Sequence, residues 1–219
     1  MRRTTTLSAL ALAAALALAG CGDGQEEETP ASGSPSPSAA TTPTGTAPAD
    51  ATPASGAAAE ISAQHNDADV VFAQMMIPHH EQAVRMSEVL LGKDGVPQDV
   101  RDLAERVART QEPEIERMQA MLTAWDAPAD AGAGHGGHGS GMVDEEGMDR
   151  LREAGEGPEA AVLYLERMTQ HHEGAVDMAR DQVEQGANPE AVELARQVVE
   201  AQEAEIREMA TMLEQVRRS

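Results

Sequence analysis

The stretch that decides the fold is Met76-Ile77-Pro78-His79-His80-Glu81-Gln82-Ala83-Val84-Arg85-Met86, because it occurs again as Met168-Thr169-Gln170-His171-His172-Glu173-Gly174-Ala175-Val176-Asp177-Met178. Seven of the eleven positions are identical, and the shared pattern is Met-x-x-His-His-Glu-x-Ala-Val-x-Met. At about 3.6 residues per turn, the Met, His and Ala positions fall on one stripe of a helix. Each copy therefore predicts an amphipathic helix whose buried face carries a pair of histidines.

A second segment is duplicated with nearly the same offset. Residues 111–122 match residues 202–213 at seven of twelve positions, 91 residues apart, while the His segments lie 92 residues apart. The repeating unit is therefore a helical hairpin that is used twice. Two long amphipathic hairpins predict an all-α protein, a four-helix bundle, and no segment carries a convincing strand pattern.

Breaks in the periodicity give the expected boundaries. We expect a duplicated domain over 60–219, with one hairpin over 66–125, a Gly/His-rich linker over 126–157 that includes a weak helical turn near 143–153, and a second hairpin over 158–217. Asn66 or Asp67 and Asn188 are expected N-caps. Gly186 is expected to end a helix in the left-handed conformation, and Pro78 is expected to kink the first helix.

The N-terminus has the layout of an export signal over residues 1–20, with Arg2 and Arg3 followed by an Ala/Leu run. Cys21, the one cysteine of the chain, follows Leu18-Ala19-Gly20 in a pattern that resembles a lipoprotein cleavage site. We expect lipidation of Cys21, export, and a membrane anchor on the outer face of the cytoplasmic membrane or on the periplasmic side. The alternative is an ordinary secreted protein with an incidental cysteine. Residues 21–59 are expected to form a disordered tether.

The formal net charge of -22 argues against nucleic acid as a partner, because phosphate binding needs a basic surface. The acidity either concentrates cations near the protein or only maintains solubility, and the sequence leaves both interpretations open. No protein partner can be read from the sequence.

The duplicated stripe combines imidazole with thioether, and we expect it to bind copper, Cu(I) or Cu(II), because thioether selects soft ions, above all Cu(I), while imidazole accepts copper and zinc. The predicted metal ligands are Met76, His79, His80, Met86, Met168, His171, His172 and Met178. Counting back from the hairpin turns brings a second group level with the histidines, as partners that orient the rings or as weaker ligands. This group is Gln111, Glu112, Glu114, Gln202, Glu203 and Glu205, with Met118 and Met209 as core residues or weaker candidates and His135 and His138 as an auxiliary tract.

Three other interpretations of the same residues differ in what each requires. A di-iron carboxylate bundle needs Glu-x-x-His motifs, whereas here Glu81 and Glu173 directly follow the His pairs and point away from the stripe. A helical interaction or structural module would use His and Met for packing alone. A copper-dependent redox enzyme would need an open coordination position. No catalytic Ser/His/Asp or Cys/His set and no phosphate-binding glycine loop can be read.

At these residues the chain resembles a bacterial family known as domain of unknown function 305. Its hallmarks are similar: Met-x-x-His-His-x-x-Ala-x-x-Met in one helix and Gln-x-x-Glu-Ile-x-x-Met in the next, and both occur twice here. The resemblance implies a ferritin-like four-helix bundle and, as for some exported members, copper binding in copper resistance. By matching position it implies the same eight His and Met residues as candidate ligands.

Overall fold

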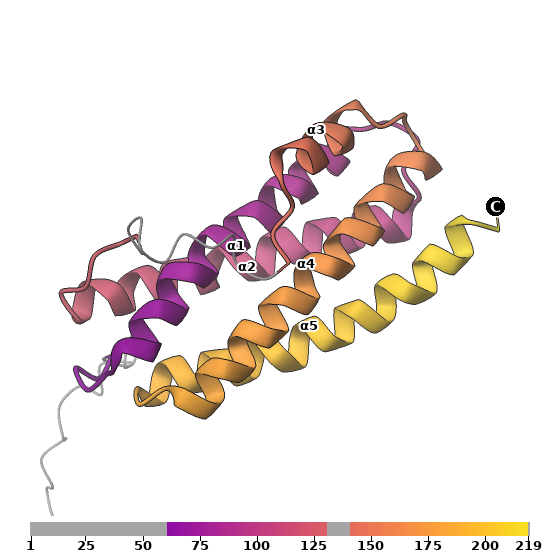
Figure 1. Cartoon of the computed structure of the whole chain (residues 1–219). Coiled ribbons are helices and arrows are strands. Elements are labelled where there is room, and N and C mark those ends of the chain that lie inside the picture. The colour runs from indigo at the N-terminus through magenta and orange to yellow at the C-terminus, as the bar shows by residue number, and fades with distance from the viewer. Residues whose placement is uncertain (1–60, 131–140, 219) are drawn as a thin grey trace, which may run out of the picture. The chain divides into compact units, whose positions relative to one another are not determined.

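The computed structural model describes residues 61–130 and 141–218, and all of its secondary structure is helical. The helices are α1 (Asp67–Leu91), α2 (Gln98–Ala124), α3 (Glu145–Glu153), α4 (Pro158–Gln185) and α5 (Pro189–Val216) (Figure 1). The predicted all-α class is therefore confirmed. Within the described residues, no helix combines the length and apolar character needed to cross a membrane.

Helix starts follow from local capping chemistry. Asn66 caps α1 through a reciprocal pair, since its side chain accepts from the Asp69 N–H at 3.1 Å and the Asp69 carboxylate accepts from the Asn66 N–H at 2.8 Å. Asn188 caps α5 through the Ala191 N–H, and Pro189 is the first helical residue. These contacts satisfy backbone donors that a helix N-terminus leaves unpaired.

Of two local expectations, that for Gly186 is wrong and that for residues 143–153 is confirmed. Gly186, expected in the left-handed conformation, has φ -69° and ψ 151°, so it ends α4 as extended backbone. The reason lies in its neighbours, because the following residues turn directly onto the buried carboxylate of Asp69. The weak helical turn expected near 143–153 is the nine-residue helix α3, capped at Asp144.

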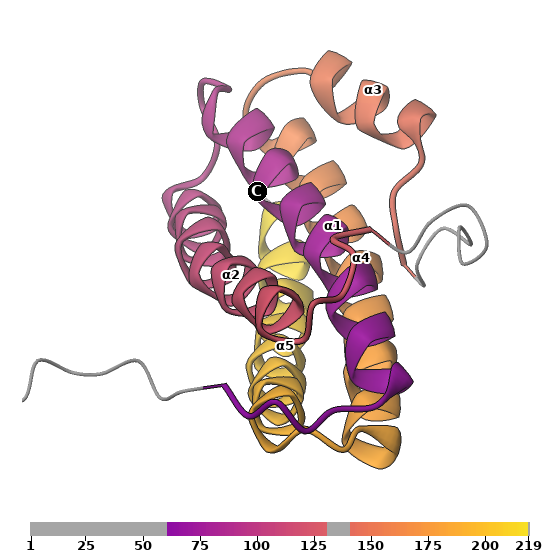
Figure 2. The ribbon, with the colours of Figure 1, turned by 90° about the vertical axis from the view of Figure 1, so that its left-hand side faces the viewer.

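The four long helices are arranged as two hairpins that cross. α1 pairs with α2, and α4 pairs with α5, while α1 and α4 form the main contact between the hairpins (Figures 1 and 2). The chain directions of α1 and α4 oppose each other: Asp69 near the start of α1 contacts the end of α4, and Ser87 near the end of α1 contacts Tyr164 near the start of α4. This arrangement brings the middle of α1, where the first His pair lies, against the middle of α4.

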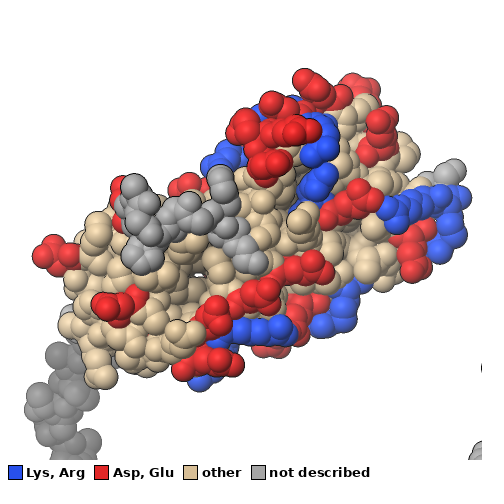
Figure 3. All heavy atoms as spheres, viewed as in Figure 1, with Lys and Arg blue, Asp and Glu red and all other residues tan. Residues whose placement is uncertain are grey.

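The surface of the described residues mixes charges of both signs. Figure 3 shows Asp and Glu side chains interspersed with Lys and Arg over the face that carries α3 and α4. Several of these charges pair within one helix or between neighbouring helices, for example Arg180 with Glu203 at 2.6 Å between α4 and α5. Exposed pairs of this kind contribute little to stability, so the packing of the helices must come from the core.

Candidate metal site

The core of the bundle is divided by a layer of polar side chains. One apolar cluster lies toward the end of α1 and the start of α4 and includes Met86, Tyr164 and Met168. A second lies toward the start of α1 and the end of α4 and includes Phe72 and Met76. Between the two clusters each long helix contributes two polar residues, and we call these the polar layer: His79, His80, Gln111, Glu114, His171, His172, Gln202 and Glu205.

The two duplicated motifs meet in this layer. The rings of His79 and His171 lie with their centroids 3.7 Å apart and their planes inclined by 36°, at the point where α1 crosses α4. All four histidines are at most 1 % exposed. Burial of imidazole is costly unless its nitrogens are satisfied, so four buried rings at one level need a physical reason.

The outer histidine of each pair is held by a carboxylate from the partner helix. The Nε2 atom of His80 lies 2.7 Å from Glu114 Oε2, and the Nε2 atom of His172 lies 2.8 Å from Glu205 Oε2. A carboxylate accepts hydrogen bonds, so a neutral ring must carry its proton on Nε2, which leaves the lone pair on Nδ1. The carboxylates therefore set both the tautomer and the orientation of the two rings.

Several acceptor or donor atoms in the layer have no hydrogen-bond partner among the described residues. They are Nδ1 of His80 and of His172, both ring nitrogens of His171, and Oε1 of Gln111 and of Gln202. Burial, and then the proximity of His79, His172 and His80, keeps the pKa of His171 well below its ordinary value. His171 is therefore neutral near pH 7 and has a lone pair available for a ligand.

The structure places the predicted residues as follows. Met76, Met86 and Met168 are fully buried on the two sides of the polar layer, and Met178 is half-buried beside the cluster of Met76. Among the expected partners, Glu114 and Glu205 contact His rings, and Gln111 and Gln202 are buried at the same level.

The remaining candidates lie elsewhere. Glu112 is exposed, and Glu203 pairs with Arg180 on the outside of the second hairpin. Met118 and Met209 are fully buried in the apolar clusters. Cys21, His135 and His138 lie outside the described residues.

A short segment that the sequence pattern did not reveal covers the crossing of α1 and α4. We call residues 141–144 the strap. The Gln82 side-chain amide donates to the Val143 carbonyl at 2.8 Å and accepts from the Val143 N–H at 2.7 Å. Gly141, at φ 82°, lies so close to α4 that an added Cβ would come within 2.6 Å of the Gln170 carbonyl oxygen and 3.0 Å of Gly174 Cα. The sequence does contain one indication of this contact, because positions 82 and 174, Gln and Gly, differ between otherwise matching motifs.

The donor chemistry of the layer narrows what it can hold. Among residues 61–130 and 141–218, no three His, Cys, Asp or Glu side chains converge in a metal-binding group. What the layer offers is buried imidazole with buried thioethers on either side. This donor set suits soft ions, above all Cu(I).

Comparison with known proteins identifies relatives of this chain. The family model of the domain of unknown function DUF305 matches residues 69–213. A candidate secreted DUF305 protein from Streptomyces coelicolor is 37% identical, with 68% of this chain and 93% of that chain covered and a TM-score of 0.64. A DUF305 fragment from Deinococcus radiodurans is 31% identical over 68% of this chain and 97% of that chain, with a TM-score of 0.62.

The copper protein CopM in its Cu(II)-bound form is 31% identical over 67% of this chain and 96% of that chain, with a TM-score of 0.58. CopM has also been solved with Cu(I) and with silver. No curated protein matches the chain.

Proposed function

The chain belongs to the DUF305 family, and we propose that it is an exported copper-binding protein that sequesters copper or hands it on through the His and Met side chains of its duplicated motif. The observation that carries the proposal is the polar layer: four buried imidazoles bracketed by thioethers, with ring nitrogens of His80, His171 and His172 that have no hydrogen-bond partner among the described residues. A buried polar atom without a partner destabilises the folded protein. A site that contains several such atoms is therefore suited to a ligand that binds to them.

The proposed ligands are Met76, His79, His80, Met86, Met168, His171, His172 and Met178. For His80 and His172 the coordinating atom is Nδ1, because Glu114 and Glu205 occupy the Nε2 side. Thioethers favour Cu(I), and imidazole accepts both oxidation states. The relative CopM, solved with Cu(I), Cu(II) and silver, supports soft-metal binding by this type of bundle.

The cellular setting completes the proposal. Cys21 is lipidated after removal of residues 1–20 and holds the protein at the membrane, and residues 21–59 act as the tether. Because Cys21 is the one cysteine of the chain and lipidation blocks its sulfur, the mature domain has no free thiol. Copper binding then depends on thioether and imidazole without help from a thiolate.

The test is a Cu(I) and Cu(II) competition assay on residues 22–219, compared with a variant in which His79, His80, His171 and His172 are all changed to Ala. We expect loss of tight binding in the variant and an increase of the melting temperature with copper in the wild type, since a ligand that binds only the folded state stabilises it. His65→Ala is the matched control, because His65 is an exposed histidine that stacks on Trp125, away from the layer.

Unchanged copper affinity in the fourfold variant, with a helical circular dichroism spectrum retained, would exclude the proposal and favour a helical module in which His and Met only pack. A separate His135→Ala/His138→Ala variant tests whether the linker tract adds affinity.

A further inference from the structure

The two His–Glu pairs of the polar layer have the same internal geometry but different surroundings. Glu114, 23% exposed, has no ion pair with Lys or Arg among the described residues. Glu205, 14% exposed, lies beside Arg106, which reaches across from α2. The first pair therefore stands alone, whereas the second is part of a larger charged group.

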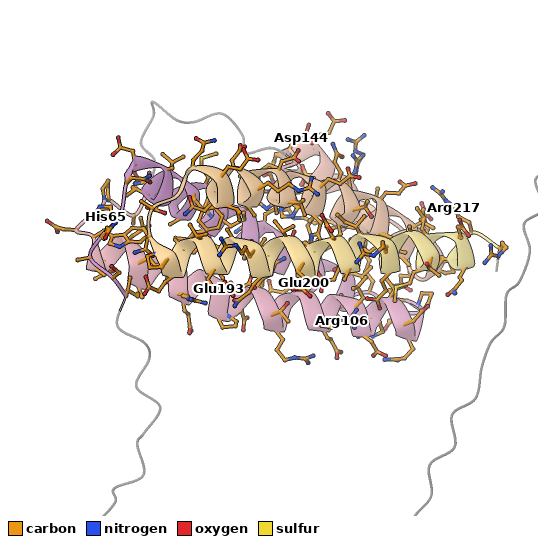
Figure 4. All side chains as sticks on the ribbon, turned by 90° about the horizontal axis from the view of Figure 1, so that it is seen from below. His65, Arg106, Asp144, Glu193, Glu200 and Arg217 are labelled. Carbon is orange, nitrogen blue, oxygen red and sulfur yellow. The ribbon has the colours of Figure 1, made fainter. Side chains whose placement is uncertain are left out.

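Arg106 connects the two hairpins. Its Nη2 donates to Glu208 Oε2 at 2.6 Å, and its Nε lies 4.0 Å from Glu205 Oε1. The other oxygen of Glu205, Oε2, is the one that contacts the His172 ring. Figure 4 shows Arg106 on α2 where that helix runs beside α5. The contact with Glu205 is an ion pair without a hydrogen bond, so Arg106 acts on this carboxylate through its permanent positive charge.

The duplication shows that this arrangement exists in one half only. The offset of 91 that maps Glu114 onto Glu205 also maps Arg106 onto Gln197 and Arg117 onto Glu208. Gln197 donates to Glu193 on its own helix, at 3.1 Å. The cation opposite the carboxylate is therefore absent from the first half, although the His and Glu residues match.

Net charge does not distinguish the two halves. Arg106 with Glu205 and Glu208 carries one net negative charge, the same as Glu114 alone. A bound copper ion therefore meets similar overall charge from either carboxylate group, and what differs is how firmly the carboxylate and its imidazole are held. Outer partners of metal-binding histidines typically change metal affinity by about 10–100-fold.

We propose that Arg106 is a positioning residue that makes the two halves of the site unequal, with the His172 half preorganised for copper and the His80 half less so. The inference rests on the proposed copper binding. Arg106 acts through Glu205, which fixes His172 with its proton on Nε2 and its lone pair on Nδ1.

The first experiment needs no copper. Long-range ¹H–¹⁵N NMR of the histidine rings in the apo protein reports the tautomer of His80 and His172 separately. We expect one fixed Nε2–H tautomer for His172 and exchange broadening or a tautomer mixture for His80. The double variant Arg106→Gln/Glu208→Gln, which keeps the net charge of the group, should make the His172 signals resemble those of His80, while Arg106→Lys should largely preserve them.

The second experiment measures Cu(I) affinity in two backgrounds, His80→Gln and His172→Gln. We expect the double variant at 106 and 208 to weaken binding about tenfold in the His80→Gln background and to leave the His172→Gln background unchanged. Equal effects in both backgrounds, or none, together with unchanged His172 ring signals, would overturn the role of Arg106. If the wild type binds no copper, the proposed function fails, while the NMR comparison still decides whether Arg106 positions His172.

Discussion

The hairpin α1–α2 and the hairpin α4–α5 contribute matching residues to the polar layer, but they differ where each contacts the rest of the chain. Position 82 is Gln and binds the strap, whereas position 174 is Gly and makes room for it. Position 69 is a buried Asp, whereas position 161 is a buried Ala. The shared residues thus form the candidate site, and the divergent residues join the two copies into one asymmetric body.

The two sides of the polar layer differ in the same way. On one side Tyr164 and Ser87 form a buried hydrogen bond of 2.9 Å. On the other side the matching positions are Phe72 and Ala179, both buried and apolar. Burial raises the pKa of Tyr164, so its hydroxyl remains protonated and can donate. At this matched pair of positions, one side therefore has a buried hydroxyl pair where the other has two apolar side chains.

The largest effect is expected at Asp69, whose counterpart Ala161 has no polar role. The fully buried carboxylate accepts from Gln182 Nε2 at 2.5 Å, from the Asn188 N–H at 3.0 Å and from the Ala187 N–H at 3.1 Å. Asp69→Ala leaves these donors unpaired and should lower the free energy of unfolding by about 3 kcal/mol in urea denaturation.

The control for Asp69 is Asp67→Ala, an exposed acidic residue in the same first turn. Its loss should cost no more than about 0.5 kcal/mol, because only a favourable interaction with the helix dipole is removed. Equal losses in the two variants would show that Asp69 does not join the hairpins.

A smaller effect is expected where the strap meets α4. Gly141→Ala places a Cβ within 2.6 Å of the Gln170 carbonyl oxygen at a φ of 82°, so the strap must shift, and the free energy of unfolding should fall by about 2 kcal/mol. Gly92→Ala is the matched control, since Gly92 has φ -75° and its added Cβ would make ordinary contacts at 3.6 Å. If both variants melt at the same temperature, the strap is not packed against α4 in solution.

Much of this organisation follows from the sequence because it is local. Asn66 and Asn188 act through hydrogen bonds to residues three positions away. Counting from a hairpin turn brings Gln111 level with His79 and leaves Glu112 and Glu114 as alternatives, of which Glu114 contacts His80 in the structure. Periodicity describes one helix face at a time. Periodicity therefore cannot predict that the rings of His79 and His171 meet, or that Arg106 contacts α5. It also cannot predict the extended backbone of Gly186, because all three features depend on how separate helices pack.

A still smaller loss of stability is expected from the buried hydroxyl pair that distinguishes the two sides of the layer. Tyr164→Phe leaves the Ser87 hydroxyl buried without its partner and should cost about 1 kcal/mol, and Ser87→Ala should cost a similar amount. The double variant recreates the Phe72 and Ala179 combination of the other side, so it should lose less than the sum of the single variants. Strict additivity in this double-mutant cycle, measured by denaturation, would mean that the two hydroxyls do not interact.

The smallest effect concerns the exposed faces of the two motifs. In α1, Nη1 of Arg85 lies 3.9 Å from Oε2 of Glu81, one turn earlier. The matching residues of α4 are Asp177 and Glu173, two like charges on an exposed face. Asp177→Arg replaces repulsion by attraction and should raise the free energy of unfolding by about 0.5 kcal/mol at low salt. Arg also favours helix more than Asp does, so Asp177→Gln separates propensity from charge. The stability gain of Asp177→Arg beyond that of Asp177→Gln should vanish in about 1 M salt, where charges are screened over roughly 3 Å. A difference that persists in high salt would have to come from packing or propensity instead.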